Sequence, residues 1–380
     1  MNSSAAPKRL LLSVFSTFEV GGPQVRFATI ANKFGRRFRH VIVAMDDAFD
    51  CKTRLSSELD VTFLAVRNRK GDTLGNRRRF RAILQKMRPD CLATYNWGTI
   101  EWGMANWPRL VRHVHIEDGF GPEEAMHQLP RRVLTRRLVL RGSDVVVPSL
   151  QLERIALNSW KLKRQALHYI PNGIDYDRFS RLNVEPLVAR DGVPVLGTVA
   201  ALRPEKNLTR LLEAFRIVRA GRPCRLVIAG DGPERGPLET AAADMQDSVV
   251  FTGYRQDTER VYAGLDIFVL SSDTEQMPTT VIEAMAAGLP VVAANVGDVA
   301  SMLATENARF VVPPTAKDLA HAIATLLDDA ALRRTIGAAN QLRAQREFGE
   351  AKMIAAYGEL FSKGAPRNAE RSARPLRATL

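Results

Sequence analysis

The chain has 380 residues, enough for two hydrophobic cores, and its 46 % hydrophobic and 25 % charged content is that of an ordinary folded protein. Its cysteines, Cys51, Cys91 and Cys224, lie far apart and form no CxxC pair, which argues against a disulfide framework or a zinc site. The opening stretch has a short apolar run interrupted by Ser13 and no small-residue cleavage site. We interpret it as a first strand rather than a secretory signal, and we expect a cytoplasmic protein.

The net charge of +13 lies entirely in the first half of the chain. Residues 1–180 contain 30 Lys and Arg against 17 Asp and Glu, whereas residues 181–380 contain 24 of each. Such an asymmetry favours an anionic partner, for example a phospholipid surface on the inner face of the cell membrane, a lipid-linked diphosphate or an anionic glycan. The alternative is a basic surface without a partner. Nucleic acid is disfavoured, because no nucleic-acid motif is present and the 7 % aromatic residues show no stacking pattern.

The segment RRVLTRRLVLR, residues 131–141, is a predicted basic helix. Val133, Leu134, Leu138 and Val139 are expected on one side, opposite the arginines, which are Arg131, Arg132, Arg136, Arg137 and Arg141. A helix of this kind lies on an anionic membrane, or it packs in a core with its arginines in solvent. Both interpretations stay open here. Residues 76–81, NRRRFR, add to the same basic surface.

Short runs rich in Val, Ile and Leu alternate with helical patterns, which is typical of βαβ units with buried parallel strands. Two successive sets predict an α/β chain of two Rossmann-like doubly wound domains. The clearest helix is Asn207–Ala220, with Asn207 as its cap and Gly221 after its end. The expected strands are Leu10–Phe15, His40–Met45, Val61–Val66, Cys91–Thr94, Val111–His115, Asp144–Pro148, Val195–Ala200, Arg225–Ala229, Val249–Thr252, Asp266–Ser271, Pro290–Ala293 and Phe310–Val312.

Proline and glycine between residues 170 and 194 mark the boundary between the two domains. We expect an N-terminal domain at residues 1–175 and a C-terminal domain at residues 176–345. A terminal helix at residues 346–363 is expected to cross back to the first domain. Residues 364–380 are rich in Arg, Ala and Pro and are expected to be a disordered tail.

The segment of residues 271–297, SSDTEQMPTTVIEAMAAGLPVVAANVG, carries the strongest chemical signal. A strand ends at its start, a loop carries Glu275, and a helix opens near Pro278 and contains Glu283. The N–H groups of Thr279 and Thr280 at the helix start would face the carboxyl ends of the strands, where anions bind in open α/β sheets. Glu275 and Glu283 suit hydroxyl groups, because each carboxylate accepts bonds from a vicinal pair.

These residues resemble a known family. Glu275 and Glu283 match the E-x7-E motif of the retaining, GT-B-fold enzymes called glycosyltransferase family 4. The blocks IPNGID (170–175), LRPEKN (202–207), IAGDGPE (228–234), FTGY (251–254) and EAMAAGLPVVA (283–293) occur in family order. The resemblance covers roughly residues 10–362 and implies a GT-B architecture, in which two Rossmann-like domains face each other across a cleft. It implies that the domain at residues 1–175 binds the acceptor and that the domain at residues 176–345 binds the nucleotide sugar.

The resemblance implies a role for each matching residue at a nucleotide-sugar donor. Glu275 would contact hydroxyls of the transferred sugar, and Glu283 would hold the ribose. Lys206 matches the lysine that grips the diphosphate. The position that usually carries the partner arginine is Ala201 in this chain, and Arg203 is the expected substitute. Both cations follow the carboxyl end of a predicted strand, where they would neutralise a leaving diphosphate.

Glycines and two first-domain residues complete the candidate site. Gly21 and Gly22 follow the first strand and would let the backbone approach the donor phosphate closely. Gly230 is interpreted as a turn glycine near the nucleotide, and the backbone at Tyr254 is expected to meet the base. The resemblance places His115 at the donor sugar, with His113 as the alternative on the same strand. Asp118 is expected to assist with the acceptor.

The resemblance implies transfer with retention and without a metal or any other cofactor, as in a hexosyltransferase of class EC 2.4. Asp175 and Asp177 spell D-x-D, but they follow PNG, where Asp residues favour a turn, so no metal role is assigned to them. We expect front-face attack by an acceptor hydroxyl of a glycan or lipid-linked acceptor, in surface polysaccharide or lipopolysaccharide synthesis. The alternatives are a sugar-nucleotide epimerase or phosphorylase on the same fold, and a catalytically silent sugar-binding relative.

Overall fold

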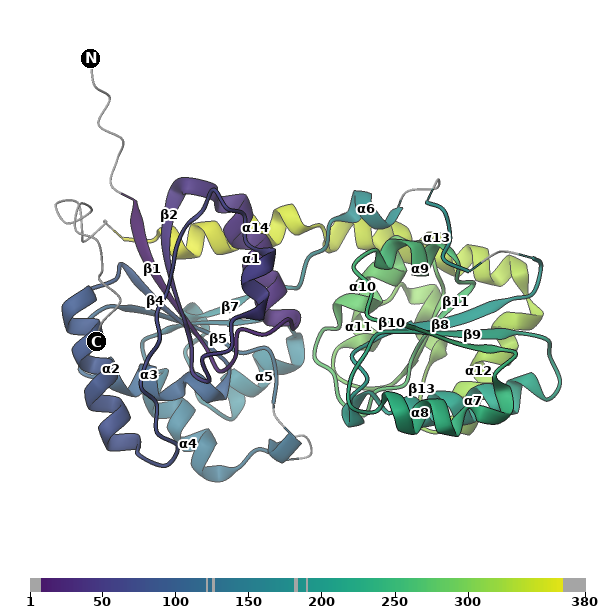
Figure 1. Ribbon diagram of the computed structural model, residues 1–380, viewed down its shortest axis with the longest axis horizontal. Coiled ribbons are helices and arrows are strands. Elements are labelled where there is room, and N and C mark those ends of the chain that lie inside the picture. Colours follow the sequence, from purple (N-terminus) through teal and green to yellow (C-terminus); the bar gives the residue numbers. More distant parts are fainter. Residues whose placement is uncertain (1–7, 121, 125–126, 181–183, 189–190, 365–380) are drawn as a thin grey trace, which may run out of the picture. The chain divides into compact units, whose positions relative to one another are not determined.

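The computed structural model describes residues 8–120, 122–124, 127–180, 184–188 and 191–364. The chain divides into two compact units, Met1–Ile170 with Ile354–Leu380, and Pro171–Met353. Each unit is an α/β layer structure around its own parallel sheet (Figure 1). The predicted tail at residues 364–380 lies, apart from its first residue, outside the described residues.

The first unit contains a seven-stranded parallel sheet in the order β3-β2-β1-β4-β5-β6-β7. The central strands are rich in Val, Leu and Ile because both faces of the sheet are covered and most of their side chains are buried, whereas Phe63 in β3 and Tyr169 in β7, at the two edges, are exposed. The strand bounds are β1 Arg9–Phe15, β2 Phe38–Ala44, β3 Asp60–Phe63, β4 Cys91–Tyr95, β5 Arg112–Ile116, β6 Asp144–Val147 and β7 Leu167–Tyr169.

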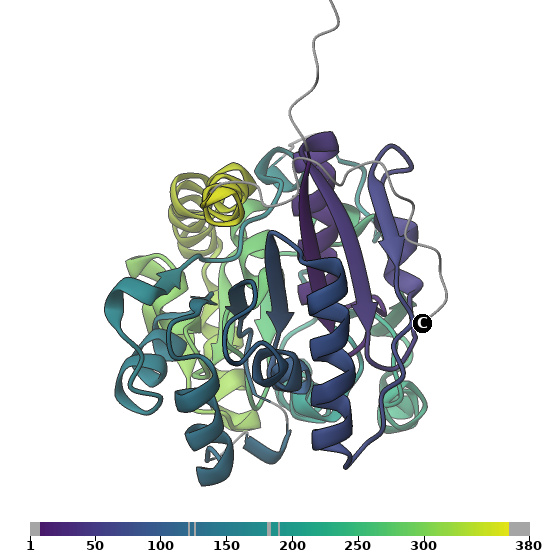
Figure 2. The same ribbon diagram turned by 90° about the vertical axis from the view of Figure 1, so that its left-hand side faces the viewer.

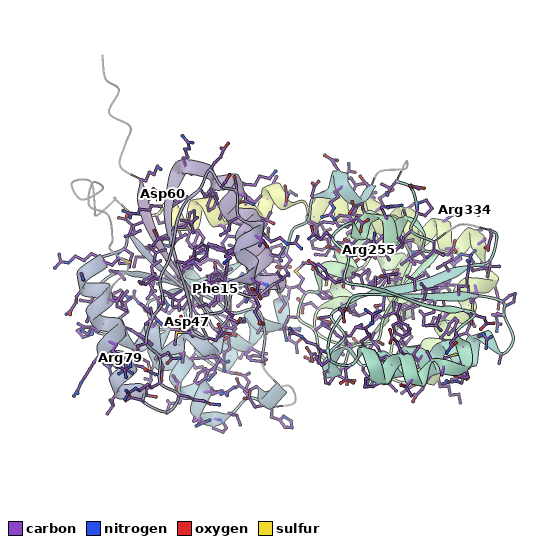
Figure 3. The ribbon with its side chains drawn as sticks, in the orientation of Figure 1. Phe15, Asp47, Asp60, Arg79, Arg255 and Arg334 are labelled. Atoms are coloured by element: carbon purple, nitrogen blue, oxygen red, sulfur yellow. The ribbon has the colours of Figure 1, made fainter. Side chains whose placement is uncertain are left out.

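Helices cover both faces of this sheet (Figure 2). On one face, Phe34 of α1 (Gly22–Phe34) meets Phe361 of α14 (Glu350–Ser362), with ring centroids 6.4 Å apart. The other face carries α2 (Thr73–Met87), α3 (Ile100–Ala105), α4 (Pro130–Val139) and α5 (Leu150–Asn158). Phe15 lies inside this unit (Figure 3), and its ring stacks on that of Tyr95 with the ring centroids 4.0 Å apart.

The second unit repeats the same winding with a six-stranded sheet in the order β10-β9-β8-β11-β12-β13. One face packs on α7 (Leu208–Arg219), α8 (Arg235–Ala241) and α12 (Ala316–Asp328). The other packs on α6 (Tyr176–Ser180), α9 (Thr258–Ala263), α10 (Thr279–Ala286) and α11 (Val299–Met302), and α13 (Ala330–Glu347) contributes to both cores. The strands are β8 Val195–Val199, β9 Arg225–Ala229, β10 Val249–Gly253, β11 Ile267–Leu270, β12 Val291–Ala294 and β13 Val311–Val312.

Each strand predicted from the sequence is present, with ends shifted by a few residues. The prediction missed β7, whose three residues are too few to show a period. The predicted helix at residues 207–220 is α7, and the Asn207 side chain accepts a hydrogen bond from Arg210 N, as its predicted capping role requires.

The boundary between the units lies at Ile170–Pro171, earlier than the expected 175–176. Residues 171–175 belong to the second unit because its elements bind them. Asn172 Nδ2 donates to the carbonyl of Met277 at 2.8 Å, and Ile174 forms a parallel bridge with Gly349. At the other end, the residues from Ile354 onwards belong to the first unit.

Candidate active site

The strand order of the second sheet reverses between β8 and β11, which are hydrogen-bonded neighbours. In open α/β sheets, ligands bind outside the carboxyl ends of the strands at this switch point. The loop that follows β8 carries Arg203 and Lys206, and the loop that follows β11 carries Glu275. Three residues that were predicted separately therefore lie on the two loops at the switch point.

Lys206 and Glu275 are in direct contact. Lys206 Nζ donates to Glu275 Oε1 at 2.6 Å, and Ser272 Oγ donates to the same oxygen at 2.8 Å. Both side chains are mostly shielded from solvent. A cation and a carboxylate are thus held side by side, an arrangement that suits a ligand carrying both phosphate and hydroxyl groups.

The backbone behind Glu275 is fixed by a tight turn that follows β12. Gly297 has φ +56°, and a Cβ atom at this position would lie 2.1 Å from the carbonyl oxygen of Glu275. Asp298 N donates to the carbonyl of Gln276 at 3.0 Å. Only glycine permits this left-handed backbone so close to the loop, and the turn therefore supports the loop that presents Glu275.

The proposed substitute for the missing arginine is exposed. Arg203 ends in solvent and has no ion-pair partner among the described residues, although its carbonyl accepts a hydrogen bond from Lys206 N at 3.0 Å. Ala201 is exposed as well. Arg203 is consequently available to an anion, but nothing holds its side chain in place beforehand.

Helix α10 carries the second glutamate, and Pro278 stands at its N-cap position rather than in its first turn. Glu283 is partly buried, and Tyr262 of α9 donates to its Oε2 at 2.7 Å. Burial raises the pKa of Glu283 to about 7, against the hydrogen bond from Tyr262 and the attraction of Arg178, which lower it. The carboxyl group therefore changes charge close to neutral pH.

The loop after β9 needs glycine at position 230, because its backbone packs directly against the backbone at Ala200. Gly230 has φ +144°, and a Cβ there would lie 1.8 Å from the carbonyl oxygen of Ala200. Gly230 N donates to the carbonyl of Gly253 at 2.9 Å, so Gly230 lies beside the segment that carries Tyr254. The side chain of Tyr254 is 54 % exposed. The next loop residue, Arg255, which is labelled in Figure 3, pairs with Asp257.

In the first unit, Gly21 and Gly22 lie where α1 begins, after the carboxyl end of β1. No described atom lies within 4 Å of a Cβ built at Gly22, so the space there is open. Asp118, after β5, forms an ion pair with Arg26 of α1 at 2.6 Å, and both side chains are nearly buried. The structure thus brings Asp118 to the start of α1, but with its carboxylate already neutralised.

His115 is completely buried, and in this conformation its ring meets protein groups rather than solvent. Thr94 Oγ1 lies 2.8 Å from His115 Nδ1 and 2.8 Å from His113 Nε2, and His113 Nδ1 lies 2.9 Å from Ser143 Oγ. Burial holds the pKa of His113 well below its usual value, so this ring is neutral. The two histidines that the sequence offered as alternatives are therefore joined through one hydroxyl.

Glu117 is buried beside these histidines, a position that was not predicted from the sequence. Its Oε2 lies 3.6 Å from His115 Nε2 and accepts from Arg136 Nε at 3.1 Å. Arg136 also binds Glu124 at 3.0 Å, and its guanidinium lies about 5 Å from the rings of Trp97, Phe120 and Trp160. The only available signal was the two-residue spacing of His113, His115 and Glu117, which puts all three on one face of a strand.

Of the two interpretations of the basic helix, the one that packs its apolar side in a core with all arginines in solvent is wrong. In α4, Arg132 and Arg136 are buried, whereas Leu134 and Leu138 are 56 % and 61 % exposed. The buried carboxylates of Glu117 and Glu124 require cations, and the arginines supply them, so the helix turns its leucines outward. Arg131, Arg137 and Arg141 stay exposed beside these leucines.

No group of three or more His, Cys, Asp or Glu residues able to hold a metal ion occurs among the described residues. Asp175, from the D-x-D sequence, accepts a hydrogen bond from Arg178 N at 3.2 Å and so occupies a turn. In the part of the chain that the structure describes, no helix combines the length and the hydropathy needed to cross a membrane.

Both units match models of known protein families. Residues 20–178 match the model "Glycosyltransferase Family 4", and residues 193–329 match "Glycosyl transferases group 1". The chain belongs to the family 4 type of glycosyltransferases. The predicted family and its α/β, GT-B fold are confirmed by these matches and by the two parallel sheets.

Relatives of this family 4 chain extend over part of its length. It is 29 % identical to 2-deoxystreptamine glucosyltransferase of Streptomyces kanamyceticus over 49 % of the chain and 50 % of that protein. It is 28 % identical to a GDP-mannose-dependent phosphatidylinositol monomannoside mannosyltransferase of Corynebacterium glutamicum, over 61 % of the chain and 66 % of that protein. The chain therefore spans about half to two thirds of the length of these relatives.

Solved structures share the fold over nearly the whole chain. Anabaena Alr3699/HepE, solved in complex with UDP, superposes with a TM-score of 0.76 at 19 % identity, over 93 % of this chain and 99 % of that one. At this identity the likeness concerns the fold.

Proposed function

We propose that this family 4 chain is a retaining glycosyltransferase that moves a sugar from a nucleoside-diphosphate donor to a glycan or lipid-linked acceptor. The observation that carries this proposal is the contact between Lys206 and Glu275 at the switch point of the second sheet, 2.6 Å between Nζ and Oε1. One group suits the diphosphate and the other suits the hydroxyls of the transferred sugar. Glu283, further along α10, suits the ribose.

The chemistry needs charge stabilisation more than a nucleophile. As the sugar leaves, negative charge grows on the diphosphate and positive charge on the sugar ring. Lys206 and Arg203, together with the N–H groups of Thr279 and Thr280 at the start of α10, would stabilise the diphosphate. The acceptor oxygen attacks the anomeric carbon from the side of the leaving group, the bond to phosphate breaks, and a phosphate oxygen takes the proton. In this scheme, neither a metal nor another cofactor takes part.

The proposal extends to the kind of acceptor and to the place in the cell where the protein works. Leu134 and Leu138 face solvent on α4 between Arg131, Arg137 and Arg141, a pattern that suits an anionic membrane surface. The Corynebacterium relative is named for a lipid acceptor. We therefore propose that α4 lies on the inner face of the cell membrane and that the acceptor is carried on a lipid.

The test is release of the nucleoside diphosphate from a panel of UDP-, GDP-, ADP-, dTDP- and CDP-sugars, with the anomeric configuration of the product read by NMR. Transfer with retention supports the proposal. Production of an epimerised nucleotide sugar, or phosphate-dependent cleavage of a glycan, would replace it with the epimerase or phosphorylase alternative. Binding of a donor without turnover in the presence of acceptor lipid extracts would indicate a silent relative.

A further inference from the structure

The two loops at the switch point of the second sheet are tied together by groups that have no predicted contact with the donor. β8 and β11 pair side by side, but their loops leave the sheet separately, and a lysine side chain has several freely rotating bonds. The short distance between Lys206 Nζ and Glu275 Oε1 therefore needs a cause beyond the attraction of the two charges.

Two hydrogen bonds fix the backbone on both sides of the Lys206 side chain. Ser271 Oγ donates to the carbonyl of Lys206 at 3.0 Å, and Asp273 N donates to the carbonyl of Glu205 at 2.9 Å. Both donors belong to the loop that carries Glu275. The backbone that presents the lysine is thus attached to the loop that presents the glutamate.

Arg210 of α7 closes the connection. Its NH1 group donates to the carbonyl of Ser271 at 2.8 Å, and its NH2 group donates to Asp273 Oδ1 at 2.6 Å. Its side chain is only 15 % exposed. The planar guanidinium therefore holds both the backbone and a side chain of the Glu275 loop in one rigid fork.

Asn207 completes a ring of interactions. Its Nδ2 lies 3.1 Å from both carboxylate oxygens of Asp273, while its Oδ1 accepts from Arg210 N and caps α7. Asn207 adopts a left-handed backbone, φ +42°, directly after Lys206. The helix, its cap and both loops are consequently joined to one another by hydrogen bonds.

We propose that Arg210, acting through Asp273, is a positioning residue of the transferase. It sets the spacing between Lys206 and Glu275 and does not touch the donor. This inference rests on the proposed function. Nothing in the family motifs points to it, because Arg210 follows the matched LRPEKN block and Asp273 precedes Glu275.

The experiment compares steady-state kinetics of wild type, Arg210→Ala, Arg210→Lys and Asp273→Asn with the donor that the wild type consumes fastest among UDP-glucose, GDP-mannose and the other sugars of the panel. Arg219→Ala is the matched control, because Arg219 lies on the same helix and binds Asp247 at 2.9 Å away from both loops. Cooperative thermal unfolding of each variant establishes that it is folded.

Arg210→Ala is expected to raise the donor KM and to lower kcat/KM by about tenfold to 100-fold, the range that follows from misplacing a group by about 1 Å. Asp273→Asn is likewise expected to raise the donor KM and to lower kcat/KM. Arg210→Lys should retain an intermediate activity. Arg219→Ala matches the wild type. A purely structural loss would lower kcat through a smaller active fraction and leave KM unchanged, which would overturn the proposal.

A double variant separates action through Lys206 from an independent effect. If Arg210 acts by setting the spacing between Lys206 and Glu275, adding Arg210→Ala to Lys206→Ala costs several-fold less activity than Arg210→Ala costs in the wild type. Additive losses would overturn the positioning role while leaving the proposed function intact. A wild-type protein that neither binds nor consumes any donor would instead overturn the proposed function, and the role of Arg210 with it.

Discussion

Lys206 reaches across from the loop after β8 to bind Glu275 on the loop after β11, with 2.6 Å between Nζ and Oε1. Each group neutralises the other in the absence of a ligand. A donor that brings a diphosphate and a sugar together would replace this pair with two separate contacts, the lysine to phosphate and the glutamate to hydroxyl groups.

Substituting either partner should therefore reduce transfer strongly. Lys206→Ala and Glu275→Gln are each expected to lower the rate of nucleoside diphosphate release by about 100-fold to 1,000-fold, as for the loss of one preorganised stabilising group. Lys317→Ala, at an exposed lysine on α12 of the same unit, is the control and should leave the rate unchanged. Near-normal rates in both site variants would remove these residues from the mechanism.

Donor affinity should depend on pH through Glu283. The pKa of this carboxyl group is raised to about 7 by burial, so it is mostly protonated at pH 6 and mostly ionised at pH 8. The ionised form accepts stronger, charge-assisted hydrogen bonds from the two ribose hydroxyls than the protonated form does. Between these two pH values, affinity for the nucleoside diphosphate should rise by up to about tenfold, which isothermal titration calorimetry measures.

The Glu283→Gln variant should bind weakly with little dependence on pH. The stability of the ligand-free protein should change in the opposite direction from donor affinity. Because the pKa of Glu283 in the folded state lies above the ordinary value of a glutamate, its ionisation destabilises the fold as the pH rises toward and through about 7. The variant should therefore lose less stability than the wild type between pH 5 and pH 8. An unchanged pH profile of binding in the variant would assign the titration to another group.

The buried arginine of α4 should matter for stability. Arg136→Met leaves Glu117 and Glu124 buried without their main cation and should lower the free energy of unfolding by about 3–5 kcal/mol, as measured by urea denaturation. Arg137→Met, at the exposed neighbouring position, should have almost no effect. Adding Glu117→Gln and Glu124→Gln to Arg136→Met should recover part of the loss, because the stranded charges are removed.

Membrane contact is predicted through the outward leucines of α4. The Leu134→Glu/Leu138→Glu variant should lose sedimentation with phosphatidylglycerol-containing vesicles, because it removes apolar contact and adds negative charge. Leu342→Glu changes a similarly exposed leucine in the second unit and serves as the control. Wild-type binding should weaken at high salt. Equal sedimentation of both variants would show that α4 is not the contact.

The sequence was sufficient for the features that depend on local patterns. Buried parallel strands appear as runs of Val, Ile and Leu, and the cap at Asn207 follows from a side chain that can bond its own helix start. The switch-point loops were recognisable because glycine, proline and charged residues follow strands there. β7 is too short for such a pattern.

Features that depend on tertiary contacts were missed or misread. The arginines of α4 looked like a solvent face, because nothing in the local pattern shows that Glu117 and Glu124 are buried beside them. Arg210 and Asp273 are separated by a long stretch of chain, and only the folded sheet brings them together. The predicted roles of His115 and Asp118 stay predictions. In the structure, His115 is completely buried and Asp118 forms an ion pair with Arg26.

The most direct test of the central claim is a thermal-shift panel of UDP, GDP, ADP, TDP and CDP on the wild type and on Glu283→Ala. A ligand that binds only the folded state stabilises it by about 2.7 kcal/mol at 100 times its dissociation constant. We expect at least one diphosphate to raise the melting temperature of the wild type and Glu283→Ala to lose this response. Failure of every diphosphate to stabilise the wild type, or an undiminished response in the variant, would contradict it.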